Sequence, residues 1–160
     1  MSAIEPPISV TLEQESDFAF RITFDHRAFA PLLTDEPSPL GHDRGPNPSR
    51  LLLASVVNCL TANLLFALRK YKNAPGRLRA KVTATPMRNL EGRWRIPQAF
   101  VEIQLPEGNE NYAQLDRVLE QFQQFCIVTE SVRQGIEVEV TVKDIHGHVL
   151  LGDKSFEAGS

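Results

Sequence analysis

The sequence has only two cysteines and no large excess of charge of either sign. Two cysteines exclude a disulfide-rich scaffold, and a net charge of −3 with scattered lysines and arginines provides no basic stripe for nucleic acid. Glycine-rich phosphate loops and internal repeats are also lacking, so we expect no nucleotide or other cofactor. With 42% hydrophobic and 23% charged residues, the chain predicts a single globular domain over residues 1–160.

The first residues lack the positively charged and then apolar segments of a secretory signal. We therefore expect the protein in the cytoplasm, where a structural disulfide is disfavoured. There, Cys59 and Cys126 are either two inert core thiols or a redox pair, and the choice depends on whether the fold brings them together.

An uncharged run at residues 51–68 is long enough to span a membrane. Four polar residues, two of them asparagines, interrupt the run, and amides at mid-bilayer are costly, so we expect no membrane span. The run instead predicts a helix from Asn47, a good N-cap followed by Pro48, to Lys72. Because this helix is apolar on most of its circumference, we expect a second subunit to cover it.

The remaining segments predict loops, strands and two further helices. Residues 34–48 are rich in proline and glycine and predict a loop. An amphipathic helix is expected from Tyr112 to Phe125, then a short helix that ends at Gly135, whereas the tail from His146 is weakly patterned. Alternating apolar and polar residues predict two hairpins and a later strand: 8–14 with 18–24, 78–85 with 94–105 broken at Pro97, and 136–143.

The surroundings of both cysteines favour a reactive pair. On a helical wheel Cys59 shares its sector with small and polar residues: Ser55, Asn58, Ala62 and Asn63. Cys126 precedes a short helix, whose N-terminus favours a thiolate. One thiolate would then reduce a peroxide, the other would resolve the sulfenic acid into a disulfide, and a nearby arginine would stabilise the attacking thiolate.

Metal binding and cysteine–histidine hydrolysis are the competing interpretations. The four histidines lack the short paired spacings of zinc sites: His26, His42, His146 and His148. We therefore expect no metal. Nothing in the sequence places a histidine against either thiol, so the hydrolase stays an alternative without a located base.

The chain resembles the OsmC/Ohr family of bacterial thiol-dependent peroxidases. The resemblance rests on Gly-Pro-Asn-Pro leading into the helix through Cys59, residues 45–59, and on residues 126–132 followed by the strand after Gly135. It implies an α+β, OsmC-like fold, with antiparallel sheets packed around long central helices, in an intertwined homodimer. It also implies that Cys59 reduces organic hydroperoxides at the subunit interface and Cys126 resolves it, with a dithiol such as a dihydrolipoyl protein as reductant.

Two positions depart from the family pattern. Glutamate often follows the Asn-Pro pair and orients a catalytic arginine, whereas this chain has Ser49, and proline often follows the second cysteine, where this chain has Ile127. Arg44 is our candidate for the cation that stabilises the thiolate, and Arg21 is the alternative. The missing glutamate also motivates a second hypothesis, in which the chain has lost peroxidase activity and binds a small apolar ligand in the interface pocket.

Overall fold

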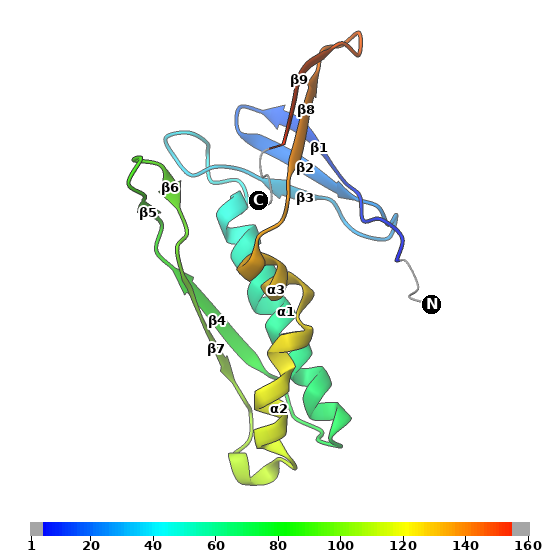
Figure 1. The fold of residues 1–160 in the computed structure, drawn as a ribbon, viewed down its shortest axis with the longest axis vertical. Coiled ribbons are helices and arrows are strands. Elements are labelled where there is room, and N and C mark those ends of the chain that lie inside the picture. Colours follow the sequence, from blue (N-terminus) through cyan, green and yellow to red (C-terminus); the bar gives the residue numbers. More distant parts are fainter. Residues whose placement is uncertain (1–4, 155–160) are drawn as a thin grey trace. The chain divides into compact units, whose positions relative to one another are not determined.

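The computed structural model describes residues 5–154, which form antiparallel β-sheets and one long helix (Figure 1). The chain divides into two compact units, one up to Ala54 and one from Ser55 onward. The helix α1 (Pro48–Lys70) begins in the first unit and continues in the second. The predicted α+β class is therefore confirmed, whereas the single domain stays a prediction.

The first unit contains a three-stranded antiparallel sheet in the order β1-β2-β3. Strand β1 (Val10–Ser16) pairs with β2 (Ala19–Phe24), as the predicted hairpin requires, and Asp17 makes the turn with a φ of 48°. Strand β3 (Leu32–Thr34) was not predicted, because three residues are too few to show an alternating pattern.

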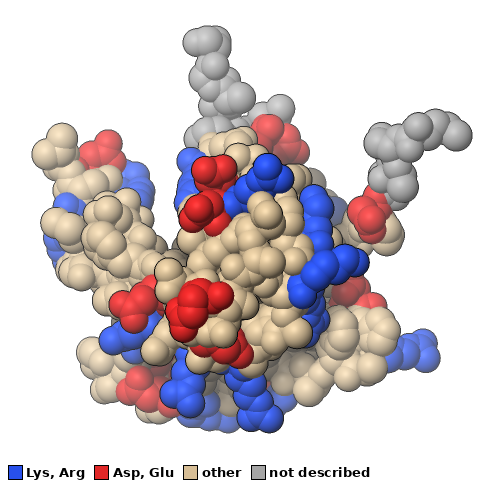
Figure 2. Space-filling model, turned by 90° about the horizontal axis from the view of Figure 1, so that it is seen from below, with Lys and Arg blue, Asp and Glu red and all other residues tan. Residues whose placement is uncertain are grey.

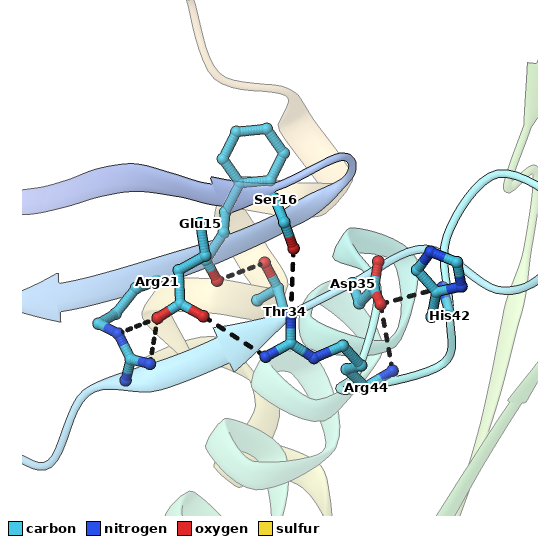
Figure 3. Close-up of polar contacts among 8 residues, drawn as sticks. Glu15, Ser16, Arg21, Thr34, Asp35, His42 and Arg44 are labelled. Atoms are coloured by element: carbon cyan, nitrogen blue, oxygen red, sulfur yellow. Dashed lines mark hydrogen bonds and ion pairs between the residues drawn. The ribbon is translucent and has the colours of Figure 1, made fainter.

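A buried carboxylate organises the loop between β3 and α1. Asp35 is only 2% exposed and accepts a hydrogen bond from the backbone N–H of Glu36 at 2.8 Å. It also accepts hydrogen bonds from the backbone N–H groups of His42 and Arg44 at 3.0 and 3.2 Å (Figure 3). Burial raises the pKa of Asp35, but the three donors outweigh burial and hold this pKa below its usual range. The loop is therefore tied to a charged aspartate.

The Gly-Pro-Asn-Pro segment fixes the start of α1. A Cβ atom at Gly45 would lie 2.2 Å from the carbonyl oxygen of Leu33, so only glycine fits there. The Asn47 side chain accepts a hydrogen bond from the backbone N–H of Arg50 at 3.2 Å, which confirms the predicted N-cap. Pro48 then occupies the first helical position, where a missing N–H costs nothing.

The helix α1 ends at Lys70, so the predicted end at Lys72 is wrong by two residues. Lys72 has a φ of 65°, and the backbone N–H of Asn73 donates to the Leu68 carbonyl at 3.0 Å, which closes the helix. The Asn73 side chain also accepts a hydrogen bond from the backbone N–H of Ala113 at 2.7 Å. Asn73 therefore joins the helix end to the segment before α2.

The second unit contains three antiparallel strand pairs and the shorter helices. The expected interruption near Pro97 is confirmed, and the late strand begins at Glu139 rather than at residue 136. The pairs are β4 (Arg79–Ala84) with β7 (Ala99–Gln104), β5 (Met87–Arg88) with β6 (Trp94–Arg95), and β8 (Glu139–Lys143) with β9 (Val149–Lys154). Strand β9 was not predicted, because its pattern is weak.

The predicted helix over 112–125 is shorter than expected and is divided. Its helical part is α2 (Leu115–Gln121), after a 3₁₀ turn η1 (Asn109–Asn111) and before a second turn η2 (Phe122–Phe125). The short helix α3 (Ile127–Gln134) follows, and Gly135 ends it with a φ of 81°, as predicted.

The core of the second unit lies along one row of α1. Four apolar residues spaced by one turn are buried: Val56, Leu60, Leu64 and Leu68. The first two pack with Cys126, and the last two pack with Val118 of α2, while Ile103 of β7 packs against both clusters. The helix α1 is long and apolar enough to cross a membrane by length and composition, and within the unit this row of its residues packs in the core.

Large apolar side chains also remain exposed in the single chain. On α1, Leu52 is 44% and Phe66 is 71% exposed, and Val10 and Leu12 of β1 are both more than half exposed. Lysine and arginine side chains are interspersed with aspartate and glutamate on the face seen in Figure 2. Large apolar side chains are therefore exposed in both units.

Candidate dithiol site

The two cysteines meet where α1 packs against the start of α3. Cys59 lies on α1 beside the buried Leu60 and is half-buried, whereas Cys126 immediately precedes α3 and is fully buried. Cys59 packs against the hydrophobic cluster that contains Cys126, and the two thiols are close enough for each to shift the pKa of the other. Both are free cysteines. The fold therefore brings together two sulfurs that are far apart in the sequence.

Two polar side chains flank the thiol pair. The Sγ atom of Cys126 lies 3.0 Å from the hydroxyl oxygen of the buried Thr129. The Asn63 side-chain amide donates to the Cys59 carbonyl at 3.0 Å and lies 3.5 Å from the Cys59 Sγ atom. Each partner follows its cysteine by three or four residues, the spacing that places side chains together on a helix.

The two thiols differ in the direction of their pKa shifts. Burial raises the pKa of Cys59, and the hydrogen bond with Cys126 raises it further. Burial also raises the pKa of Cys126, but its contacts with Cys59, Thr129 and Asn63 outweigh burial and place its pKa below the ordinary value. The surroundings of the two thiols therefore shift their pKa values in opposite directions.

An apolar pocket adjoins the site through Asn63. It has a volume of about 110 Å³ and is lined mostly by aromatic and aliphatic side chains of α1, of the turn that follows it, and of α2 and η2: Phe66, Ala67, Tyr71, Val118, Phe122 and Phe125, with Asn63, Lys70 and Gln121. The same Asn63 contacts the Cys59 sulfur. A small apolar group in this pocket would thus lie beside a residue of the dithiol site.

Arg44 and Arg21, the two predicted cations, belong to the first unit and share one carboxylate (Figure 3). Arg21 forms an ion pair with Glu15, and Arg44 lies 3.6 Å from the other oxygen of the same carboxylate. Arg44 also donates a hydrogen bond to the Ser16 hydroxyl at 3.2 Å. A glutamate from β1 therefore holds both guanidinium groups, although the expected glutamate is absent at Ser49.

Sequence reasoning missed Glu15 because it placed this residue in a turn. In the structure β1 extends through Glu15, and Glu13 pairs with Arg21 across the hairpin. Glu15 therefore lies diagonally opposite Arg21 on the same face, where opposite charges attract. If the predicted first strand had been extended by two residues, to Ser16, its pairing with the second strand would have placed Glu15 near Arg21.

The second departure from the family pattern has a simple local explanation. Ile127 is the first residue of α3, and proline is favoured at this position only because the missing N–H has no helical partner. Isoleucine also fits there, so the substitution leaves the helix start after Cys126 intact.

Three histidines have partners other than the thiols. His148 lies 3.0 Å from Asp144, His42 lies 3.4 Å from Asp17, and the ring of His26 stacks on that of Phe29. Within residues 5–154, no group of three or more histidine, cysteine, aspartate or glutamate side chains could hold a metal ion.

The fold and the matched residues identify the family. The family model described as OsmC-like protein matches residues 41–141, more than half of the chain and a range that includes both cysteines. The chain belongs to the OsmC-like family. A comparison with curated proteins finds no match.

Solved structures of several bacterial proteins are similar to this chain. An OsmC-like protein of unknown function from Vibrio cholerae is 14% identical, with a TM-score of 0.66 over 79% of this chain and 94% of that one. An organic hydroperoxide resistance protein from Elizabethkingia anophelis is 18% identical, with a TM-score of 0.64 over 85% and 94%. OhrB of Bacillus subtilis, also an organic hydroperoxide resistance protein, is 16% identical, with a TM-score of 0.60 over 79% and 90%. At these identities the likeness shows the fold.

Proposed function

We propose that the protein is a cytoplasmic thiol peroxidase that reduces organic hydroperoxides with Cys59 and Cys126. The observation that carries this proposal is that two free thiols, one half-buried and one buried, lie at the same hydrophobic cluster. Cys59 attacks the hydroperoxide and becomes a sulfenic acid, and Cys126 then displaces the oxygen to form a disulfide. A dithiol, such as a dihydrolipoyl protein, reduces the disulfide and completes the cycle.

The pocket beside Asn63 supports an organic substrate. Its lining is mainly aromatic and aliphatic, so it favours the alkyl or aryl group of an organic hydroperoxide over hydrogen peroxide, which has no apolar part. The names of the proteins from Elizabethkingia anophelis and Bacillus subtilis agree with this substrate class.

In the proposed reaction, Arg44 stabilises the negative charge that develops on sulfur and on the leaving oxygen, and Arg21 is the alternative. A guanidinium is suited to this role because it stays charged and donates several hydrogen bonds. The shared contact with Glu15 supports this role, since the carboxylate orients both guanidinium groups without help from residue 49.

We also propose that the protein is an intertwined homodimer. The exposed apolar side chains of α1 and β1 support this assembly, because the hydrophobic effect favours their burial against a second copy. In a homodimer the same patch contributes from both subunits, so one apolar helix face covers another.

A charge at Phe66 tests the dimer. Phe66→Glu is expected to convert a dimer into monomers, because burying an unpaired carboxylate in an apolar interface is costly. Sedimentation analysis at several protein concentrations measures the change. Leu90→Glu is the matched control: Leu90 is fully exposed in the turn between β5 and β6, so this variant keeps the mass of the wild type. A wild-type protein that is monomeric throughout would refute the dimer.

Turnover tests the peroxidase proposal. Wild-type protein is expected to consume cumene hydroperoxide in the presence of dihydrolipoamide, and Cys59→Ser is expected to lose this activity completely. The rate is measured as dihydrolipoamide oxidation, with hydrogen peroxide as the comparison substrate. Equal rates for the wild type and Cys59→Ser would remove the proposal.

The same pocket supports one other function, the binding of a small apolar ligand without peroxidase activity. In that case a ligand would stay bound through purification, and Cys126→Ser would still bind it. Mass spectrometry of the native and the denatured protein would detect such a ligand. Formation of a disulfide between the two cysteines after peroxide treatment would count against this function.

A further inference from the structure

We propose that Asp35 is a positioning residue for Arg44: its buried carboxylate fixes the backbone of this arginine, while Ser16 holds the guanidinium at the other end. The inference rests on the proposed peroxidase function for the role of the cation, and it names what keeps that cation in place. Arg44, rather than Arg21, is then the cation of the proposed reaction. All four residues belong to the first unit.

The segment that carries Arg44 is a loop without regular secondary structure. Residues 35–47, between β3 and α1, form neither helix nor strand and contain three prolines, which have no backbone N–H to donate. A loop of this kind holds an arginine in one place only where other groups bind its backbone. The position of Arg44 therefore depends on the partners of its own N–H group and of its guanidinium.

Asp35 binds the backbone of Arg44 from a buried position. The Oδ2 atom of Asp35 accepts the backbone N–H groups of both His42 and Arg44, at 3.0 and 3.2 Å (Figure 3). Hydrogen bonds to a charged acceptor are stronger than those between neutral groups, and burial of the carboxylate strengthens them further. One oxygen atom thus sets the path of the backbone over residues 42–44.

The surroundings of this carboxylate leave it little freedom. A Cβ atom at Gly41 would lie 2.3 Å from the Oδ1 atom of Asp35, so the loop closes directly over the carboxylate. The preceding residue, Thr34, is buried and donates its hydroxyl to the Phe20 carbonyl oxygen of β2 at 3.2 Å. Asp35 is therefore anchored to the sheet, and it connects the sheet to Arg44.

The guanidinium of Arg44 is held separately. Its Nη1 group donates to the Ser16 hydroxyl at 3.2 Å, and its Nη2 atom lies 3.6 Å from the Glu15 carboxylate (Figure 3). Arg21 forms a closer ion pair with the same carboxylate. Because Coulomb attraction falls with distance, Glu15 offsets more of the charge of Arg21 than of Arg44. Arg44 is therefore the better group to stabilise negative charge in the proposed reaction.

A guanidinium stabilises developing charge most when it is already in place before the reaction. An arginine side chain has many rotamers, so holding it at both ends removes motion that would otherwise be lost in the transition state. Loss of either hold leaves Arg44 charged but misplaced. The kcat value is then expected to fall while KM for the hydroperoxide changes little, because the lost interaction belongs to the transition state.

Asp35→Asn tests the backbone hold, since it keeps the shape but leaves one acceptor oxygen for three N–H donors. With cumene hydroperoxide and dihydrolipoamide, kcat is expected to fall by about tenfold with KM unchanged. Arg44→Ala is expected to lower kcat by about 100-fold, and Asp35→Asn added to it is expected to cause no further loss. Asp43→Asn is the matched control, because this exposed carboxylate in the same loop accepts from Ser38. It is expected to keep the wild-type kcat.

The double variant separates positioning from a general effect on the fold. If Asp35→Asn lowered kcat by the same factor with and without Arg44, the proposal would be overturned, because Asp35 would then act on something other than this arginine. A wild-type kcat in folded Asp35→Asn would also overturn it. A larger loss in Arg21→Ala than in Arg44→Ala would refute the choice of Arg44 as the cation.

Ser16→Ala keeps the proposal testable if Asp35→Asn does not fold, because Ser16 is exposed at the end of β1. It removes the hydrogen bond to the guanidinium, so kcat is expected to fall by about threefold, and not at all when Arg44 is alanine. An unchanged kcat in Ser16→Ala would then overturn the proposal.

Amide hydrogen exchange measures the backbone hold without turnover. The His42 and Arg44 amides, followed by NMR, are expected to exchange about tenfold faster in Asp35→Asn than in the wild type. Equal exchange in the two proteins would overturn the hold. A wild type that protects these amides but reduces no hydroperoxide would refute the peroxidase function and leave the hold on Arg44 standing.

Discussion

Replacement of Cys126 by serine is expected to stop the reaction after one hydroperoxide per subunit, with a sulfenic acid left on Cys59. Serine cannot form the S–S bond that resolves this intermediate, and the half-buried site shields it from other thiols. Steady-state turnover with dihydrolipoamide is then expected to fall to the level of Cys59→Ser. Trapping with dimedone, followed by peptide mass spectrometry, locates the adduct on Cys59.

Wild-type protein is the positive control for this experiment. After treatment with cumene hydroperoxide and no reductant, it is expected to show one Cys59–Cys126 disulfide in the peptide map and no dimedone adduct. Cys59→Ser is expected to show neither product. Sustained turnover by Cys126→Ser would mean that the external dithiol attacks the sulfenic acid directly, and Cys126 would lose its resolving role.

Leu68→Ala is expected to lower the free energy of unfolding by about 2 to 5 kcal/mol, the cost of deleting a large side chain from a packed core. Leu68 is fully buried and packs with Leu64 and Val118, among other neighbours on α2 and β7. The loss is a large part of the roughly 5 to 15 kcal/mol that stabilises a domain. Denaturant unfolding measures it, at one protein concentration for all variants, because a dimer unfolds in a concentration-dependent way.

Leu90→Ala supplies the matched control, because the chemical change is the same and Leu90 is fully exposed. Its free energy of unfolding is expected to lie within about 0.5 kcal/mol of the wild type. An equally small effect of Leu68→Ala would contradict the core described for the second unit.

The local features of the fold could be predicted from the sequence because each depends on residues that are neighbours in the chain. Asn47 and Pro48 start α1 through a cap and a preset φ angle, and Gly135 ends α3 through a positive φ. The end of α1 was less predictable. Asn73 closes the helix early through a hydrogen bond to Leu68 and contacts Ala113, a residue forty positions later.

The candidate site shows the same division. A helical wheel showed the sector of small and polar residues around Cys59. Asn63 belongs to this sector, and in the structure it contacts the Cys59 sulfur. The sequence did not reveal that Arg21 and Arg44 both contact the Glu15 carboxylate, because these contacts depend on how far β1 extends and on its register with β2. A shift of two residues at a strand end was enough to hide the pair.

By itself the sequence determined the α+β class, the long apolar helix and the two candidate thiols, since these follow from composition, periodicity and motif. Only the tertiary structure decided that the thiols meet and that their surroundings differ, with Thr129 and Asn63 as the polar partners. The physical reason is that the ionisation of a thiol depends on burial and on donors within a few ångströms. The fold brings such donors together from segments that are distant in the chain.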